Sequence, residues 1–260
     1  MIRRQLLTGL IVTVVMTLLL GFVYPLVVTG IAQVAFHNKA NDSLVTVNGK
    51  VVGSSLLGQS FADKDGNPLP KYFQPRPSAT SPDAYNAASS TASNLGPSNA
   101  NLIGNVPGVA VGDDGKPITT NPYATKADPY CVPVQATDKD GNDVTDAAGN
   151  AVYEKNKDGS YVCNPDTVPE RVLAYRALNG LAADVKVPAD AVTSSASGLD
   201  PQISVANARF QAARVANARH MSVAQVTGLI AAHTQGRQLG VLGEQTVNVL
   251  SLNLALDQTR

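Results

Sequence analysis

Residues 6–36 read LLTGLIVTVVMTLLLGFVYPLVVTGIAQVAF, and this stretch decides how the rest of the chain is arranged. It contains no acidic or basic side chain, and a helix needs only about 20 such residues to cross a bilayer core of about 30 Å. Leu6 to Tyr24 already meets that length, so we expect Pro25 either to kink the helix or to mark where it leaves the hydrocarbon. The sequence therefore predicts one membrane-spanning helix.

The charges that flank this stretch predict its orientation. Arg3 and Arg4 precede it, and the first basic residue after His37 is Lys39. By the positive-inside rule, residues 1–5 are cytoplasmic, residues 6–36 form the membrane helix and its outer extension, and the rest is extracytoplasmic. A cleaved signal peptide is the alternative, but its apolar region usually spans only about 7 to 15 residues.

Small side chains recur along one face of the predicted membrane helix. Some of these small residues share one side of the helix, which lets another helix approach closely. The small residues are Thr8, Gly9, Thr13 and Thr17. We therefore regard Thr13, Thr17 and Pro25 as candidate contacts with a partner in the membrane.

Length and charge limit the rest of the chain. With 260 residues, one helix and one domain with an insertion are the natural expectation. The 20 basic residues balance the 20 acidic ones, so no overall charge favours nucleic acid. We predict an α+β fold, in which a single extracytoplasmic domain with hairpins and C-terminal helices comprises residues 37–102, an insertion at 103–166, and residues 167–260.

The first part of this domain carries a strong hairpin signal. Residues 43–61 contain two β-branched runs around Asn48-Gly49, a dipeptide typical of tight hairpin turns. The proline-rich stretch from Pro68 to Pro107 has almost no apolar periodicity. It is expected to form a shaped loop or a binding surface.

The insertion, residues 103–166, resembles a series of small hairpins. Asp114-Gly115, Asp140-Gly141 and Asp158-Gly159 recur between short apolar runs. An EF-hand would need glycine at its sixth position, whereas Gly141 falls at the fourth position of an Asp-rich loop that starts at Asp138. Turn chemistry therefore explains these residues better than calcium binding.

The chain has two cysteines, Cys131 and Cys163, and both follow the membrane segment. Because an extracytoplasmic compartment is oxidising, we expect them to form a disulfide. Two free cysteines are the alternative, and a metal site would need more ligands at closer spacing.

Helices are predicted in the C-terminal part. Pro169 opens a helix over 170–183, Ser204 caps a helix over 205–219, and Ser222 caps a helix over 223–233. Residues 247–256 fit a strand by alternation and a helix by spacing, and we favour the helix. The residues expected to face the core are Ala208, Ala212, Val215, Ala216, Val223, Val226, Leu229 and Ile230, with Arg209 and Arg214 off this face.

Motifs for catalysis or nucleotide binding are missing from the sequence. It contains no phosphate-binding loop, no G-x-S-x-G elbow and no H-E-x-x-H helix. His233, at a predicted helix C-terminus, is more typical of a dipole partner than of a catalyst. We therefore predict no catalytic residues, no metal site and no firmly bound cofactor.

Several segments resemble one protein family. They are GFVYPLVVTG (21–30), GSSLLGQSF (53–61), YFQPRPSA (72–79), Tyr85-Asn86, ASSTASNLGPSN (88–99), SASGLDPQISVANA (195–208), 211–219 and HTQGRQLGVLGEQTVNVLSLNLALD (233–257). In this order they resemble the C subunit of the bacterial Kdp potassium-transporting P-type ATPases. The stretch from about Ile103 to Asp166 is much longer than in the family pattern.

This resemblance implies a non-catalytic subunit in a complex associated with ATP and K⁺. Its expected partners are a channel-like potassium-binding subunit, an ATP-hydrolysing pump subunit and a very small membrane peptide. The resemblance also implies a catalytic chaperone that raises the pump's affinity for ATP, with a nucleotide region proposed at Leu95, Gly96, Pro97 and Ser98. Our topology conflicts with that region, because a loop outside a 30 Å apolar layer does not reach cytosolic ATP.

We therefore expect the exported domain to dock on the outer mouth of the potassium-binding subunit. Prolines that restrict the chain, together with aromatic and arginine side chains, are typical of interfaces. The candidate interface residues in this domain are Tyr72, Phe73, Arg76, Asn94, Asn99, His233 and Arg237. Two alternatives are a membrane-anchored exported enzyme or solute-binding module acting alone, and a purely structural envelope protein.

Overall fold

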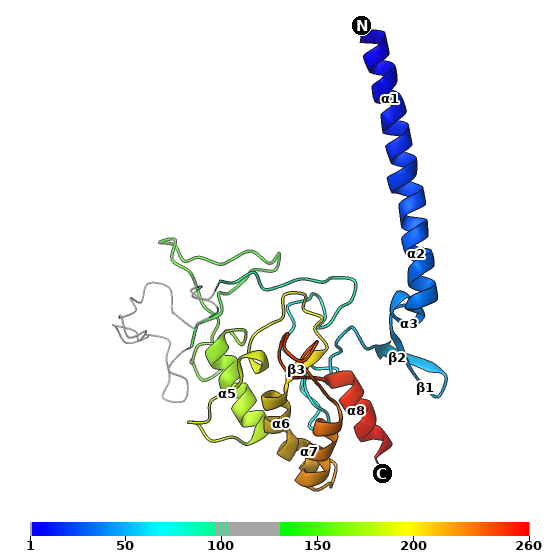
Figure 1. Ribbon diagram of the computed structural model, residues 1–260. Helices are drawn as coiled ribbons and strands as arrows, with labels where there is room; N and C mark the ends of the chain where they lie inside the picture. Colours follow the sequence, from blue (N-terminus) through cyan, green and yellow to red (C-terminus); the bar gives the residue numbers. More distant parts are fainter. Residues whose placement is uncertain (1, 97–98, 100–101, 103–130, 260) are drawn as a thin grey trace. The chain divides into compact units, whose positions relative to one another are not determined.

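The computed structural model describes residues 2–96, 99, 102 and 131–259. The chain divides into two compact units, Met1–Leu57 and Gly58–Arg260. The first hairpin falls in the same unit as the N-terminal helix, whereas all the C-terminal helices fall in the second unit (Figure 1).

The N-terminal helix is continuous and long. It consists of α1 (Ile2–Leu18), a π-helical turn (Leu19–Val23) and α2 (Tyr24–Ala35) (Figure 1). Its 34 residues have the length and composition of a membrane span, as the sequence predicted.

Pro25 does not end this helix, because the π-helical turn accommodates it. A proline ring clashes with the carbonyl four residues earlier in a regular α-helix. Here the N–H of Tyr24 donates to the oxygen of Leu19, five residues earlier, so the turn is wider just before Pro25. The helix therefore continues to Ala35.

A short helix, α3 (His37–Ala40), leads to the predicted hairpin. β1 (Leu44–Val47) pairs antiparallel with β2 (Lys50–Ser54), with a register shift between Val45 and Thr46. Asn48 and Gly49 have φ angles of 50° and 78°, the left-handed conformation that this two-residue turn requires. The hairpin prediction is confirmed.

Among its described residues, the second unit contains a small antiparallel sheet and four helices longer than one turn. The strands are β3 (Gln202–Ser204), β4 (Thr234–Gln235) and β5 (Thr246–Asn248), in the order β3-β5-β4. The helices are α5 (Val168–Asn179), α6 (Val205–Ala218), α7 (Val223–Ala232) and α8 (Val249–Gln258), with a 3₁₀ turn, η2 (Ala189–Ala191), before β3. This arrangement confirms the α+β class (Figure 1).

The caps that start α6 and α7 are those predicted. The Ser204 hydroxyl accepts the N–H of Asn207, and Ser222 and Gln225 form a reciprocal capping box. The predicted end of α5 at residue 183 is wrong, because Gly180 adopts a left-handed φ of 63° and terminates the helix at Asn179.

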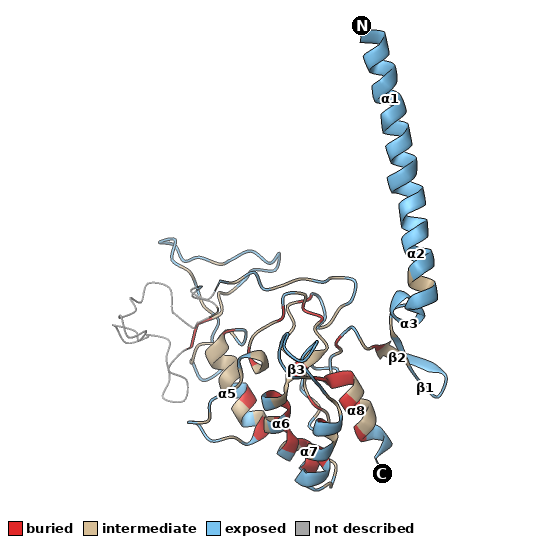
Figure 2. Ribbon diagram, in the orientation of Figure 1, coloured by how far each residue is buried: buried red, intermediate tan, exposed pale blue. Residues whose placement is uncertain are grey.

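The core of the second unit lies where α6, α7 and α8 pack on one another and on the sheet (Figure 2). Val223 is an exception to the predicted inward set. It is 49% exposed because it is the first residue of α7 and lies outside the contact made by Val226 and Ile230. The fully or nearly fully buried residues of this core are Phe73, Ile203, Ala208, Ala212, Val215, Ala216, Val226, Ile230, Val247, Val249, Leu252 and Leu256.

Residues 246–258 combine both patterns seen in the sequence. Thr246 to Asn248 form β5, and the Asn248 side chain then accepts the N–H of Ser251 to start α8. The strand and the helix follow one another, so the preference for a helix over 247–256 is confirmed except at its first two residues.

The described part of the insertion consists of tight turns joined by single β-bridges. Cys131 and Cys163 form a disulfide, with their Cα atoms 5.1 Å apart. In the turn at 138–142, Asp138 accepts the N–H groups of Asp140 and Asn142, and Gly141 has a φ of 83°. The bridges join residues 133 and 163, 135 and 153, 137 and 143, 145 and 151, and 155 and 161. The predicted Asp114-Gly115 turn lies outside the described residues.

The same turn occurs outside the insertion. Residues 63–67 repeat the sequence DKDGN of residues 138–142, and Asp63 accepts the N–H groups of Asp65 and Asn67. Backbone hydrogen bonds from Asn67 and Asn142 lower the pKa values of Asp63 and Asp138. These carboxylates are therefore turn-forming groups, and the described residues contain no cluster of three or more metal-binding side chains.

Candidate functional site

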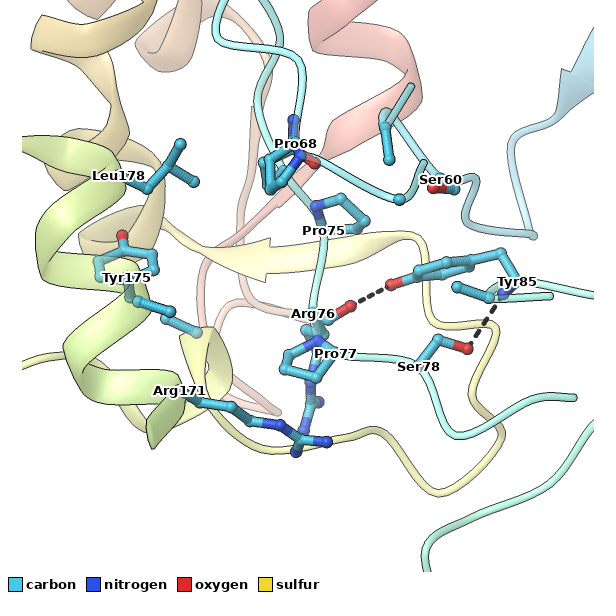
Figure 3. Close-up of a pocket in the computed structure, with 16 residues that line it drawn as sticks. Ser60, Pro68, Pro75, Arg76, Pro77, Ser78, Tyr85, Arg171, Tyr175 and Leu178 are labelled. Atoms are coloured by element: carbon cyan, nitrogen blue, oxygen red, sulfur yellow. Dashed lines mark hydrogen bonds between the residues drawn. The ribbon is translucent and has the colours of Figure 1, made fainter. Parts of the chain in front are cut away.

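A groove of about 390 Å³ lies beside the segment Pro75-Arg76-Pro77. Figure 3 shows this segment running between α5 on one side and Tyr85 on the other. Its lining is mostly apolar and comes from Ser60, Ala62, Gly66, Pro68, Gln74, Pro75, Arg76, Pro77, Ser78, Ala84, Tyr85, Arg171, Ala174, Tyr175, Leu178 and Ala191.

Both arginines of the groove are held by the protein itself. Arg76 forms an ion pair with Asp200 at 3.2 Å and donates to the main-chain oxygens of Thr193 and Ser194. Arg171 forms an ion pair with Asp166 at 2.8 Å and donates to a main-chain oxygen. Their charges therefore stabilise the walls of the groove.

Tyr85 closes one side of the groove. Its hydroxyl donates to the main-chain oxygen of Arg76 at 2.7 Å, and its N–H donates to the Ser78 hydroxyl at 3.1 Å (Figure 3). Burial raises the pKa of Tyr85 well above its ordinary value, so the phenol keeps its proton even at alkaline pH values at which an exposed tyrosine ionises. The groove thus offers a shaped apolar surface, and its polar groups serve to hold that shape.

Phe73, predicted as an interface residue, is instead the centre of the core. Its side chain is 0% exposed. The Asn253 side chain accepts its N–H at 2.9 Å and donates to its oxygen at 3.0 Å, which fixes the strand-like segment against α8. The interface prediction for Phe73 is therefore wrong, because an aromatic ring in a segment without periodicity can face inward as readily as outward.

Tyr72 and Arg76, the two other candidates in this segment, have partners within the domain. The Tyr72 ring lies 5.3 Å from that of Phe61 and 4.9 Å from the Arg219 guanidinium, and its hydroxyl donates to Asp257. Arg76 forms the ion pair with Asp200 described above. Both residues are half-buried and contribute to the fold.

Arg214, which the sequence analysis placed off the core-facing side of its helix, is half-buried and has a structural role that was not predicted. It donates to Asn179 Oδ1 at 2.9 Å, Gln211 Oε1 at 2.7 Å and the Tyr72 oxygen at 2.9 Å. Burial lowers its pKa to about 10. A polar stripe on α6, formed by Asn207, Gln211 and Arg214, runs beside the apolar face. This pattern could have predicted a network of hydrogen bonds inside the domain.

The other candidates lie at the surface. Thr13, Thr17 and Pro25 are exposed on the N-terminal helix. Asn94, Gly96 and Asn99 are exposed and Leu95 is half-buried, whereas Pro97 and Ser98 lie outside the described residues. His233 is half-buried at the end of α7, and Arg237 forms an exposed ion pair with Glu244 at 2.7 Å.

The loop that contains Arg237 has a feature that the sequence analysis missed. Leu239, Val241 and Leu242 are 89%, 74% and 56% exposed at the turn between β4 and β5. Leu239 has a φ of 53°, a conformation that is unusual for leucine. We call residues 237–244 the β4–β5 tip. Apolar side chains between Gly236 and Gly243 were the available signal.

These observations define a class of protein. It has one N-terminal apolar helix with the length and composition of a membrane span, followed by a packed α+β domain. That domain displays an apolar tip on a tight turn. Exposed apolar side chains that are grouped in this way are typical of interaction surfaces.

Comparison with known proteins identifies the particular family. The family model KdpC, described as "K+-transporting ATPase, c chain", matches residues 6–110 and 156–258. The chain belongs to the KdpC family, whose members are subunits of potassium-transporting ATPase complexes.

Individual relatives match over nearly their full lengths, and each is named "Potassium-transporting ATPase KdpC subunit". The protein from Mycobacterium tuberculosis is 41% identical over 256 residues, which cover 98% of this chain and 99% of the relative. Those from Koribacter versatilis and Dechloromonas aromatica are 36% and 40% identical, over 99% and 94% of this chain and 96% and 92% of their own lengths. The family model leaves residues 111–155 unmatched, although the Mycobacterium protein aligns with almost the whole chain.

Proposed function

We propose that this chain is the accessory subunit of a high-affinity, ATP-driven potassium uptake complex, and that its exported domain docks on the outer mouth of the potassium-binding subunit. The observation that carries the proposal is the match of the KdpC family model to both the N-terminal and the C-terminal part of the chain. The other partners would be the pump subunit and the small membrane peptide expected from the family resemblance.

The β4–β5 tip is the part of the domain best suited to docking. Leu239 and Val241 extend into solvent, and burying each such side chain is worth about 1.5–3 kcal/mol before binding costs are subtracted. The tip belongs to a packed domain tethered to a membrane helix, so the effective concentration at a neighbouring subunit is high. A modest contact is then sufficient for stable attachment.

Residues 58–260 would lie outside the cytoplasm in this arrangement. The exposed Gly96 would then be separated from cytosolic ATP by an apolar layer about 30 Å thick. An increase in the pump's affinity for ATP would therefore act through coupling among the assembled membrane helices. The domain would serve as a catalytic chaperone without contacting the nucleotide.

Co-purification of the intact complex tests the docking role. The variant Leu239→Asp/Val241→Asp should weaken attachment by about 30-fold or more, because loss of a hot spot costs about 2 kcal/mol. Val223→Asp is the matched control, since Val223 is a 49% exposed valine on α7 outside the tip. Equal recovery of partner subunits with both variants would contradict docking by the tip.

Sidedness requires a separate experiment. A protease site placed after Gly96 should be cleaved from outside in spheroplasts and protected in inside-out vesicles. Cleavage in inside-out vesicles would contradict the extracytoplasmic location. An exported enzyme or solute-binding module acting alone would purify without a large multi-span partner, so the co-purification experiment also separates that alternative from the proposal.

A further inference from the structure

A second hollow lies within the first unit, where the N-terminal helix meets the hairpin. Its volume is about 390 Å³, which is in the range of small-ligand sites. One wall comes from α3 and the residue after it, and Figure 1 shows α3 between the end of α2 and the hairpin. The other wall comes from the start of β1 and the residue after β2. We call this hollow, between residues 37–41 and residues 43–45 and 55, the juxtamembrane pocket.

Hydrogen bonds within the unit fix the walls of the juxtamembrane pocket. The side-chain amides of Gln33 and Asn41 form two hydrogen bonds, at 3.2 and 3.1 Å, so the chain after the membrane helix folds back on α2. The N–H of Ser55 donates to the main-chain oxygen of Ser43 at 3.1 Å, which holds the end of β2 against the loop before β1. The pocket is therefore a part of the folded structure.

The wall from α3 supplies hydrogen-bond donors. Asn41 Nδ2 lies 3.3 Å from His37 Nδ1, and because an amide nitrogen donates, Nδ1 accepts. The proton of the neutral imidazole is then on Nε2, which is a donor. Asn38, an exposed residue of the same wall, has a side-chain amide with two further N–H donors.

The length of the membrane helix places this pocket at a membrane surface. Its 34 residues rise about 50 Å at about 1.5 Å per residue. A tilt of about 30°, within the usual range, reduces this rise to about 44 Å, which matches the roughly 40–45 Å of a bilayer with its headgroups. With Arg3 and Arg4 among the headgroups on one side, Ala35 lies among those on the other. His37 follows two residues later, so the pocket lies at the level of the lipid headgroups.

The rest of the pocket and its surroundings suit an anionic phospholipid. Leu44 lines the pocket beside the polar donors and is 54% exposed. Residues 36–57 contain two lysines, Lys39 and Lys50, and one acidic residue, Asp42. Basic side chains near a membrane surface attract anionic lipids. N–H donors, an adjacent apolar side chain and a positive net charge together match a phosphate group that is attached to glycerol and acyl chains.

We propose that the juxtamembrane pocket binds the phosphate-bearing headgroup of an anionic phospholipid, such as phosphatidylglycerol. His37 and Asn38 donate to the phosphate oxygens, and Leu44 contacts the glycerol and the upper part of the acyl chains. A free phosphate shares the hydrogen bonds but lacks the apolar contact. The bound lipid holds the hairpin at the membrane surface. This proposal requires a helix that spans the membrane, and it does not depend on docking to another subunit.

Photo-labelling of the full-length chain in lipid nanodiscs tests the proposal. The nanodiscs consist of phosphatidylcholine with a minor fraction of phosphatidylglycerol that carries a photoreactive group on its headgroup. Adducts should map to residues 37–55, and unlabelled phosphatidylglycerol should compete with the probe, whereas inorganic phosphate should not. Labelling no stronger than with a phosphatidylcholine probe of the same design, or competition by inorganic phosphate, would overturn the proposal.

Two variants separate binding in the pocket from general labelling at headgroup depth. His37→Ala/Asn38→Ala should reduce the adduct yield at residues 43–55 by about tenfold, the loss expected for one hydrogen bond to a charged group. Thr46→Ala is the matched control, because Thr46 is an exposed polar residue of β1 outside the pocket lining, and its yield should not change. Equal yields from these two variants would contradict binding in the pocket.

A conservative substitution tests the role of His37 as a donor. His37→Gln keeps a side-chain N–H and should retain most of the adduct yield. A loss as large as that of the double alanine variant would overturn the assignment of His37. Neither readout involves recovery of partner subunits, so failure of the proposed function would leave this test unaffected.

Discussion

Phe73 distinguishes a core role from an interface role more sharply than any other residue in this domain. Its side chain is 0% exposed and contacts a core built from α6, α7 and α8. Its main chain is held in both directions by Asn253, at 2.9 and 3.0 Å. Because this clamp prevents the segment from collapsing into the space left by a smaller residue, Phe73→Ala should leave a cavity.

The expected loss of stability follows from that cavity. Replacing a buried phenylalanine by alanine costs about 3–5 kcal/mol. For a unit the size of residues 58–260, about 2–4 °C of melting temperature is lost per kcal/mol, so the midpoint should fall by about 6–20 °C.

Thermal unfolding of the full-length chain in detergent is the appropriate assay. The chain has eight tyrosines and no tryptophan, so near-UV circular dichroism of tyrosine reports on the packed domain. Leu239→Ala is the matched control, because an 89% exposed leucine should change stability by less than about 0.5 kcal/mol. If Phe73→Ala melts with the parent chain but no longer recovers partner subunits, then the assignment of Phe73 to the core is refuted.

Three further changes have defined outcomes. The double variant Cys131→Ser/Cys163→Ser removes the disulfide, whose cysteines have a sequence separation of 32, and should lower the free energy of unfolding by about 3–4 kcal/mol. An unchanged midpoint in urea unfolding would contradict this stabilisation. Gly198→Ala should destabilise the domain more than Gly66→Ala. Both glycines have a positive φ, but only at Gly198 would an added Cβ lie 2.7 Å from the Thr80 side chain. Equal urea midpoints for the two variants would argue against this contact. Burial raises the pKa of Tyr85, so the unfolded chain releases this proton first and stability should fall as pH rises above about 10. Tyr85→Phe should reduce that slope in urea titrations at alkaline pH, and an identical slope would exclude Tyr85 as its source.

Local signals in the sequence predicted several elements correctly. The caps at Ser204 and Ser222 and the turn at Asn48-Gly49 depend on hydrogen bonds and φ angles within a few residues, so neighbouring residues suffice to predict them. The end of α5 was missed, although Gly180 was a visible signal, because the apolar spacing continued past it.

Candidate interface residues were harder to predict than secondary structure. The segment around Phe73 has no periodicity, so its inward direction is set by Asn253, 180 residues later in the chain. Exposure of Leu239 is likewise decided by how β4 and β5 pair, because this pairing leaves Leu239 in the connection between the two strands and outside the packed core. Residue type alone therefore favoured an aromatic residue that is buried and overlooked a leucine that is exposed.

The sequence by itself determined the long apolar helix, the α+β class, the helix caps and the family, since these depend on composition, local hydrogen bonding and the order of motifs. Only the tertiary structure decided the order β3-β5-β4, the burial of Phe73, the hydrogen bonds of the half-buried Arg214, and the exposure of the β4–β5 tip. The physical reason is that burial depends on contacts between residues far apart in the chain. A single side chain does not specify those contacts until the whole domain has packed.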